Sequence, residues 1–162
     1  EHQGPVYYRC GYKNEPDIHR EPIDFRIGKA IELKSGTQVT LIGTGTITYN
    51  ALKAAEILEE KGISSRLLSM HTVKPIDDET ILKAAEETGA IVTVEEHNIQ
   101  GGLGSAVAEV LCDHGVGVPF QRIALPDTYV HEVGSHGWLL EQYGFTPEAI
   151  AKKAEEAVRR KR

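Results

Sequence analysis

A glycine-rich turn, Gly101-Gly102-Leu103-Gly104, is the strongest candidate for chemistry in this 162-residue chain. It follows an apolar run and precedes an amphipathic one, so it joins a predicted strand to a predicted helix. The free N–H groups at such a helix start can hold a phosphate or another anion. The acidic pair Glu95-Glu96 comes just before the turn, and its charge would repel a phosphate at close range. We therefore favour a structural strand–helix junction over an anion site.

Acidic and imidazole side chains next to this turn are the second candidate. Glu95, Glu96 and His97 could supply an acid, a base or metal ligands. The simpler interpretation is a strand end with one exposed carboxylate and one that caps neighbouring amides. His131 and His136 lie five residues apart in an irregular segment, where solvated loop histidines are a better interpretation than a metal site.

A second glycine turn, Gly43-Thr44-Gly45, resembles the start of a dinucleotide-binding fingerprint. Thr48 stands where a third glycine or alanine is expected, and the next strand ends at Ser69-Met70-His71 without an acid to hold a ribose. A tight turn is the favoured interpretation, with His71 packed against its neighbours. The sequence shows no nucleophile elbow, Walker loop or convincing carboxylate pair, so we find no complete catalytic site in it.

Strand-like and helix-like segments alternate along the chain and must position these residues. Strands are predicted over 38–42, 63–70, 90–94 and 119–125, and helices over 46–61, 77–89, 103–111, 138–143 and from 147 onward. Asp77 and Thr146 are the predicted N-caps, and 25–36 is predicted to form an edge hairpin. The alternation predicts an α/β fold with three layers, a mostly parallel five-stranded sheet with helices on both faces.

Composition limits the class of protein. A net charge of −6 argues against a nucleic-acid partner, and the apolar runs are too short to cross a membrane. We see no secretory signal, and we expect Cys10 and Cys112 to be free thiols of a cytoplasmic protein. The size and the 40% hydrophobic content fit one soluble globular domain with a core of its own.

The front of the chain has a different character. Residues 5–10 look like a strand, with almost no chain before it to pair with. Residues 11–22 are polar and broken by Pro16 and Pro22, which is typical of a linker. We expect this segment to begin inside, or at the edge of, something larger.

Four stretches, taken together and in order, resemble the C-terminal domain of transketolase. They are Gly4 to Arg9, Val39 to Gly45, Ser69 to Asp77 with its Lys-Pro-hydrophobic-Asp motif, and Val94 to His97 with Gly101 to Val107. The wider group includes 1-deoxyxylulose-5-phosphate synthase and the β subunits of 2-oxo acid dehydrogenases, which remain alternatives. His71-Thr72 before Lys74-Pro75, and Glu96-His97 before the glycines, favour transketolase.

The resemblance implies that this chain and the cofactor-binding site belong to different parts of the enzyme. Residues 1–10 would be the closing strand of a preceding pyrimidine-binding domain, 11–26 a linker, and 27–162 the transketolase C-terminal domain. Thiamine diphosphate and magnesium would be bound outside this chain, by the remaining transketolase domains or subunit. This portion would then be non-catalytic, inactive alone, and would support a dimer that transfers a two-carbon ketol unit between sugar phosphates.

The resemblance also predicts one residue that contacts the substrate. Transketolases have an arginine after the closing strand that helps bind the sugar phosphate, and the matching stretch here is Cys10-Gly11-Tyr12-Lys13. Lys13 is the nearest cation and the candidate phosphate contact, although lysine lacks the bidentate fork of arginine. Arg9 is expected to be structural, and Arg20 is a less well aligned candidate. A hypothesis of another class, a stand-alone nucleotide- or anion-binding module, uses the glycine turns instead.

Overall fold

The computed structural model describes residues 3–11, 15–19 and 22–161. The strands are β1 (Ile31–Lys34), β2 (Val39–Thr44), β3 (Ser65–Ser69), β4 (Ile91–Asn98) and β5 (Phe120–Leu125). The helices are α1 (Thr48–Glu60), α2 (Asp78–Thr88), α3 (Leu103–Asp113), α4 (His136–Gln142) and α5 (Pro147–Arg159). No helix in these described ranges is long and apolar enough to cross a bilayer.

The five strands form one sheet in the order β1-β3-β2-β4-β5. β2 pairs in parallel with β3 and β4, and β4 pairs in parallel with β5. Only the edge pair β1–β3 is antiparallel among the described strands. The predicted mostly parallel five-stranded sheet is confirmed.

The hairpin predicted over 25–36 is wrong. β1 lies within the predicted segment and precedes β2, yet it pairs with β3, from Ile31 opposite Ser69 onward. β3 returns through α1 and aligns with β2 over five residues, so it takes the edge of β2 that a hairpin partner would need. β1 is left with the outer edge of β3.

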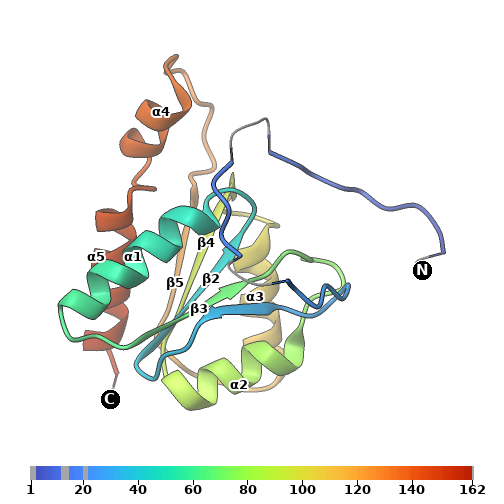
Figure 1. The fold of residues 1–162 in the computed structure, drawn as a ribbon, viewed down its shortest axis with the longest axis vertical. Coiled ribbons are helices and arrows are strands. Elements are labelled where there is room, and N and C mark those ends of the chain that lie inside the picture. Colours follow the sequence, from blue (N-terminus) through green and yellow to red (C-terminus); the bar gives the residue numbers. More distant parts are fainter. Residues whose placement is uncertain (1–2, 12–14, 20–21, 162) are drawn as a thin grey trace.

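Helices cover both faces of the sheet, as Figure 1 shows. α1 and α5 pack on one face, around Leu41, Leu67 and Val92, and Phe145 closes that cluster. α2 and α3 pack on the other face, around Ile42, Leu68 and Ile91. Neighbouring strand residues enter opposite clusters because strand side chains alternate between faces. The predicted three-layer architecture is therefore confirmed.

Local signals mark the helix ends correctly. Asp77 accepts a hydrogen bond from Thr80 N at the start of α2, and Thr146 accepts one from Ala149 N at the start of α5. Gly89 ends α2 in the left-handed conformation that glycine adopts at low cost. These contacts lie within one helical turn, so the sequence is sufficient to predict them.

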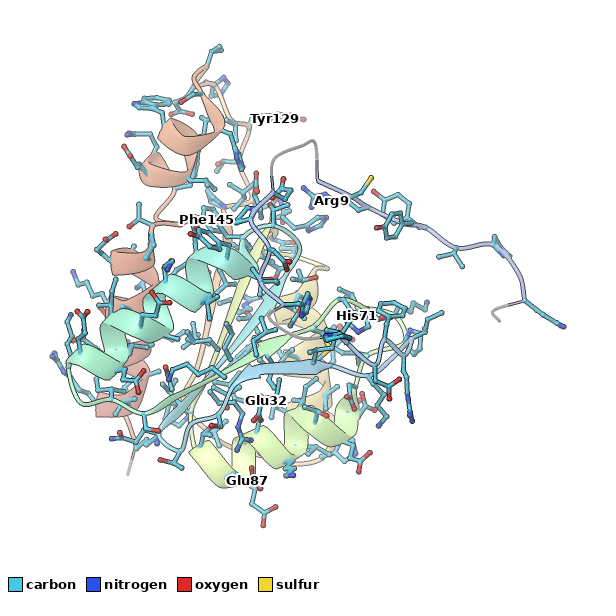
Figure 2. The ribbon with its side chains drawn as sticks, viewed as in Figure 1. Arg9, Glu32, His71, Glu87, Tyr129 and Phe145 are labelled. Atoms are coloured by element: carbon cyan, nitrogen blue, oxygen red, sulfur yellow. The ribbon has the colours of Figure 1, made fainter. Side chains whose placement is uncertain are left out.

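Two segments differ from the sequence-based expectation. β4 continues to Asn98, four residues past its predicted end, so Glu95 and Glu96 belong to the strand. Residues 5–10 are extended and exposed, and they join no strand of the described sheet (Figures 1 and 2). The assignments of 1–10 to a preceding domain and of 11–26 to a linker stay predictions.

Candidate functional site

The Glu95 carboxylate occupies the N-terminus of α3. Glu95 Oε2 accepts from Leu103 N at 2.6 Å, and Oε1 accepts from Gly104 N at 2.6 Å. The residue is only 1% exposed. Both oxygens of a buried acidic side chain are thus matched to the amides that a helix start leaves unpaired.

The glycines of the turn make this arrangement sterically feasible. Gly101 has a φ of +74°, which turns the chain from β4 into α3. A Cβ at Gly102 would collide with Glu95 Oε2. A Cβ at Gly104 would lie 2.8 Å from Thr93 Oγ1 and 2.7 Å from Arg122 Cδ, so α3 approaches the sheet closely there.

This geometry decides between the two interpretations of the turn. An incoming phosphate would need the same amides that Glu95 already holds, and it would meet the Glu95 oxygens. The predicted structural junction is confirmed, with a side-chain carboxylate in the position of an anion. The prediction that one acid caps neighbouring amides is also confirmed, and Glu95 is that acid.

In the described structure, the side chains of Glu96 and His97 form no hydrogen bond with the N-terminus of α3. Glu96 lies one position along β4, on the opposite face, and its Oε1 is 2.9 Å from His136 Nε2. Its carbonyl oxygen accepts a weak hydrogen bond from Arg9 Nη1 at 3.4 Å. His97 Nδ1 lies 3.1 Å from the carbonyl oxygen of Asn98. The three side chains do not converge on one point, which a shared acid–base or metal site would require.

Metal ligands do not gather elsewhere in the described chain either. No group of three or more His, Cys, Asp or Glu side chains there is placed to hold an ion. His136 is paired with Glu96, and the backbone N–H of His131 donates to Glu132 Oε2 at 3.2 Å. Cys10 and Cys112 are both free, as predicted, and both are exposed.

The Gly43-Thr44-Gly45 turn is packed tightly against its own helix. A Cβ at Gly43 would lie 2.8 Å from Thr48 Oγ1 and 3.1 Å from Thr48 Cα. Thr48 is buried, in the place where a nucleotide fingerprint would have a small residue. The structure therefore supports the tight-turn interpretation.

His71, at the exit of β3, is a packed histidine as predicted. Its ring centroid is 4.4 Å from that of Phe25, and Nδ1 lies 2.8 Å from Thr72 Oγ1. Burial lowers the pKa of His71 below the usual histidine value, because a charged ring would lose hydration there.

Asp77 connects the chain that leaves β3 to the chain that enters the edge strand β1. Burial disfavours the charged form of Asp77, but hydrogen bonds from Ala30, Thr80 and Lys29 outweigh it and lower the Asp77 pKa. Ala30 N donates to Oδ2 at 2.9 Å, and Thr80 Oγ1 donates to the same oxygen at 2.7 Å. One carboxylate thus caps α2 and anchors the chain entering β1.

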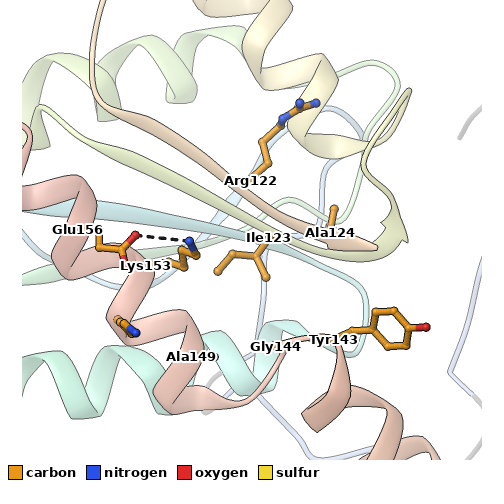
Figure 3. Close-up of a pocket in the computed structure, with 9 residues that line it drawn as sticks. Arg122, Ile123, Ala124, Tyr143, Gly144, Ala149, Lys153 and Glu156 are labelled. Atoms are coloured by element: carbon orange, nitrogen blue, oxygen red, sulfur yellow. Dashed lines mark hydrogen bonds and ion pairs between the residues drawn. The ribbon is translucent and has the colours of Figure 1, made fainter. Parts of the chain in front are cut away.

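A shallow pocket of about 390 Å³ lies between β5 and α5 (Figure 3). Lys153 on its wall is paired with Glu156 at 3.4 Å. Arg122 directs its guanidinium to the α3 side of the sheet, where Nη1 donates to the Ile99 carbonyl at 2.8 Å. The described residues thus present no convergent set of donors in this pocket.

The predicted phosphate contact, Lys13, lies outside the described residues, as do Tyr12 and Arg20. Arg9 is described and lies exposed within the extended residues 5–10 (Figure 2). Its assignment as a structural residue is consistent with its contact to the Glu96 carbonyl.

Sequence reasoning missed the contacts that hold the segment after β5. Asn98 Nδ2 and Gln100 Nε2 donate to the two oxygens of Asp127, at 2.9 and 3.0 Å. Glu96 and His136 form a further link across 40 positions of sequence. No local pattern signals these pairs, because they form only after β4 and β5 are aligned.

The family follows from comparison with known proteins. Residues 28–150, most of the chain, match the family described as "Transketolase, C-terminal domain". The chain belongs to the transketolase C-terminal domain family. Its fold agrees with a solved structure described as a split gene transketolase in an inactive β4 tetramer. The TM-score is 0.82 and the identity 39%, over 91% of this chain and 47% of that one.

Individual relatives share much of this sequence. A subunit of apulose-4-phosphate transketolase from Phocaeicola vulgatus is 44% identical over 157 residues, which cover 96% of this chain and 49% of that protein. A 1-deoxy-D-xylulose-5-phosphate synthase from Symbiobacterium thermophilum is 43% identical over 165 residues, 99% of this chain and 25% of that protein. This transketolase C-terminal domain spans about half the length, or less, of the relatives it matches.

Proposed function

We propose that this chain is the C-terminal portion of a thiamine-diphosphate-dependent transketolase and supports the assembly without contributing catalytic groups. The complete enzyme would move a two-carbon ketol unit between sugar phosphates. The family assignment and the split-transketolase relative support the enzyme class. Copies of this chain would associate with one another and with the part that holds the cofactor.

One observation carries the non-catalytic part of the proposal. The α3 N-terminus is the strongest anion-site candidate in the sequence, and Glu95 fills it. A diphosphate requires free donors and a neutral or positive surrounding, so these residues do not fit thiamine diphosphate. We therefore propose that the cofactor and its magnesium are bound outside this domain.

We propose that Lys13 contacts the phosphate group of the sugar substrate. In the complete enzyme, replacement by alanine would raise the apparent KM for the phosphorylated sugar, because one phosphate charge would lose its partner. Arg9, which we expect to be structural, and Arg20, the less well aligned candidate, would serve as comparison variants.

Titration calorimetry tests the proposal directly. The chain alone, titrated with thiamine diphosphate and magnesium, should give no binding heat. The same titration on the complex with the cofactor-binding subunit should show binding. A separate assay with sugar substrates should then show ketol transfer by that complex. Tight cofactor binding by the chain alone would overturn its supporting role.

The proposal has three alternatives. The synthase relative keeps 1-deoxyxylulose-5-phosphate formation open, and a product assay on the complex distinguishes it from ketol transfer. A 2-oxo acid dehydrogenase β subunit remains the third enzyme class. A stand-alone nucleotide or anion module would show a rise in melting temperature with NAD, ATP or phosphate.

A further inference from the structure

Residues 22–27, which precede β1, are here called the strap, and they lie against the loop between β3 and α2. The ring of Phe25 packs on the ring of His71, with centroids 4.4 Å apart and planes inclined by 32°. Figure 2 shows His71 at the end of β3, beside the chain that leads into β1. Ile23, Phe25 and Ile27 are exposed and belong to neither apolar cluster of the core. The docking of the strap thus depends on the ring pair.

The chain after the strap is anchored separately. Gly28 has a φ of +77°, and a Cβ there would lie 3.1 Å from Pro75 Cγ. Ala30 N donates to Asp77 Oδ2 at 2.9 Å, and Lys29 Nζ donates to Asp77 Oδ1 at 3.3 Å. The chain from Lys29 onward can therefore stay bound while the strap moves about Gly28.

The His71 ring has one polar atom that the fold leaves without a partner. Nδ1 lies 2.8 Å from Thr72 Oγ1, a hydroxyl that can donate or accept. Nε2 is buried and has no hydrogen-bond partner in the described chain. A neutral ring tolerates this, because Nε2 can be the nitrogen without a proton. A protonated ring has an N–H at both positions, so a charged donor would be buried without an acceptor.

The charges around His71 do not compensate for protonation of its ring. The charged or titratable side chains on the two packed segments are His19, Asp24, Arg26 and Lys29 on one, and Lys74 and Asp77 on the other. Asp24 pairs with Arg26 at 2.7 Å, and Asp77 pairs with Lys29 at 3.3 Å. No ion pair joins His71 to these side chains in the part of the chain that the structure describes. Burial lowers the pKa of His71, the Lys29 backbone raises it in part, and the charge of His19 lowers it further.

We propose that the strap is a pH-sensitive latch, docked on His71 while the ring is neutral and released when the ring gains a proton. The charged ring must reach water, and it does so by parting from Phe25. The released form binds more protons than the docked one, so docking is unaffected above the usual histidine pKa of about 6.5 and weakens as the pH falls below it. The latch acts within this chain and does not depend on the proposed enzyme class.

The anchor after the strap responds to pH in a different range. The pKa of Asp77 is lowered in the folded chain, so its carboxylate keeps its proton acceptors well below the range in which His71 titrates. The contacts of Asp77 to Lys29 and Ala30 therefore persist when the strap is released. Gly28 lies between the two parts and serves as the hinge.

Fluorine NMR on the chain labelled with 4-fluorophenylalanine tests the latch. The sequence has three phenylalanines, and two of them, Phe120 and Phe145, pack in the apolar clusters of the domain. Between about pH 7.5 and about pH 5, the Phe25 resonance should move toward that of a solvent-exposed phenylalanine. The Phe120 and Phe145 resonances should stay in place, because the domain remains folded.

Two histidine variants identify the group that titrates. His71→Asn removes the ring and keeps a polar atom for Thr72, so the Phe25 resonance should no longer depend on pH. The matched control is His19→Asn, which leaves His71 in place. Its transition should persist and move to higher pH, because the charge of His19 disfavours protonation of His71.

A reciprocal measurement uses a substitution at an exposed position. Phe25→Ala removes the stacked ring, so proton NMR should give His71 a pKa closer to about 6.5 than in the wild type. Each pKa unit of difference corresponds to about tenfold weaker docking of the protonated form. Ile23→Ala, which removes apolar surface from the strap but keeps the ring pair, should leave the His71 pKa unchanged.

A Phe25 resonance that ignores pH would rule out the latch, as would a transition that persists in His71→Asn. Movement of all three fluorine resonances with one midpoint would also overturn it, because the whole domain would then be responding. The same holds if Phe25→Ala leaves the His71 pKa at its wild-type value.

Discussion

A buried carboxylate is costly unless its oxygens are hydrogen-bonded, and both oxygens of Glu95 are. The partners are backbone amides at a helix start, where the helix dipole also favours negative charge. Glu95 therefore stabilises the α3 N-terminus in the way a bound anion would. Its neighbour Glu96 is directed to the other face of the sheet and contacts His136 instead.

Replacement of Glu95 by alanine should lower the free energy of unfolding by about 3 kcal/mol, because two buried N–H groups lose their acceptor. Glu95→Gln should cost less, since the amide oxygen can still accept one bond. Urea denaturation measures both, with Glu96→Gln as the control expected to cost less than about 1 kcal/mol. A Glu95→Ala variant as stable as the wild type would contradict this role.

Asp77 should make stability sensitive to acid. Its pKa is lowered in the folded chain, so its stabilising contribution is fully present above the unfolded value of about 3.9 and is lost as pH falls through the folded value. Asp77→Asn should cost about 2 kcal/mol at pH 7 and should flatten the loss of stability below about pH 4. Denaturation series at several pH values measure it.

The exposed neighbour Asp78 provides the matched control for that series. Asp78→Asn should leave the acid dependence close to that of the wild type. Parallel acid profiles for wild type and Asp77→Asn would show that the Asp77 hydrogen bonds contribute nothing to the pH response.

At the scale of elements, α3 packs closely on the sheet because two glycines near its start have no side chain. Gly102 leaves space for the Glu95 carboxylate, and Gly104 lets the first turn of α3 approach β4 and β5. The glycine spacing that resembled a ligand cradle thus serves the contact between a helix and its own strand. A glycine pattern alone does not distinguish these two uses.

Gly104→Ala should destabilise the chain by about 2 kcal/mol, because the new methyl would overlap Thr93 and Arg122 and force α3 outward. The control is Gly117→Ala, where a Cβ would meet nothing within 4 Å. Thermal denaturation of both variants compares them. Equal melting temperatures would show that α3 can shift at no cost.

At the scale of the whole molecule, two apolar clusters share one sheet and complete a three-layer domain. Among the described residues, the most exposed large apolar side chains lie outside those clusters, on residues 5–10 and 126–138. These exposed side chains thus take no part in the core of the domain.

The sequence by itself determined the order of strands and helices from β2 onward, the caps at Asp77 and Thr146, and the family. These depend on periodicity and on contacts within a turn, which are local. Only the tertiary structure decided that β1 pairs with β3, because β3 returns from beyond α1 to take the edge of β2. It also decided which acid caps α3. β4 extends to Asn98, and strand alternation turns Glu95 to the α3 face and Glu96 away from it.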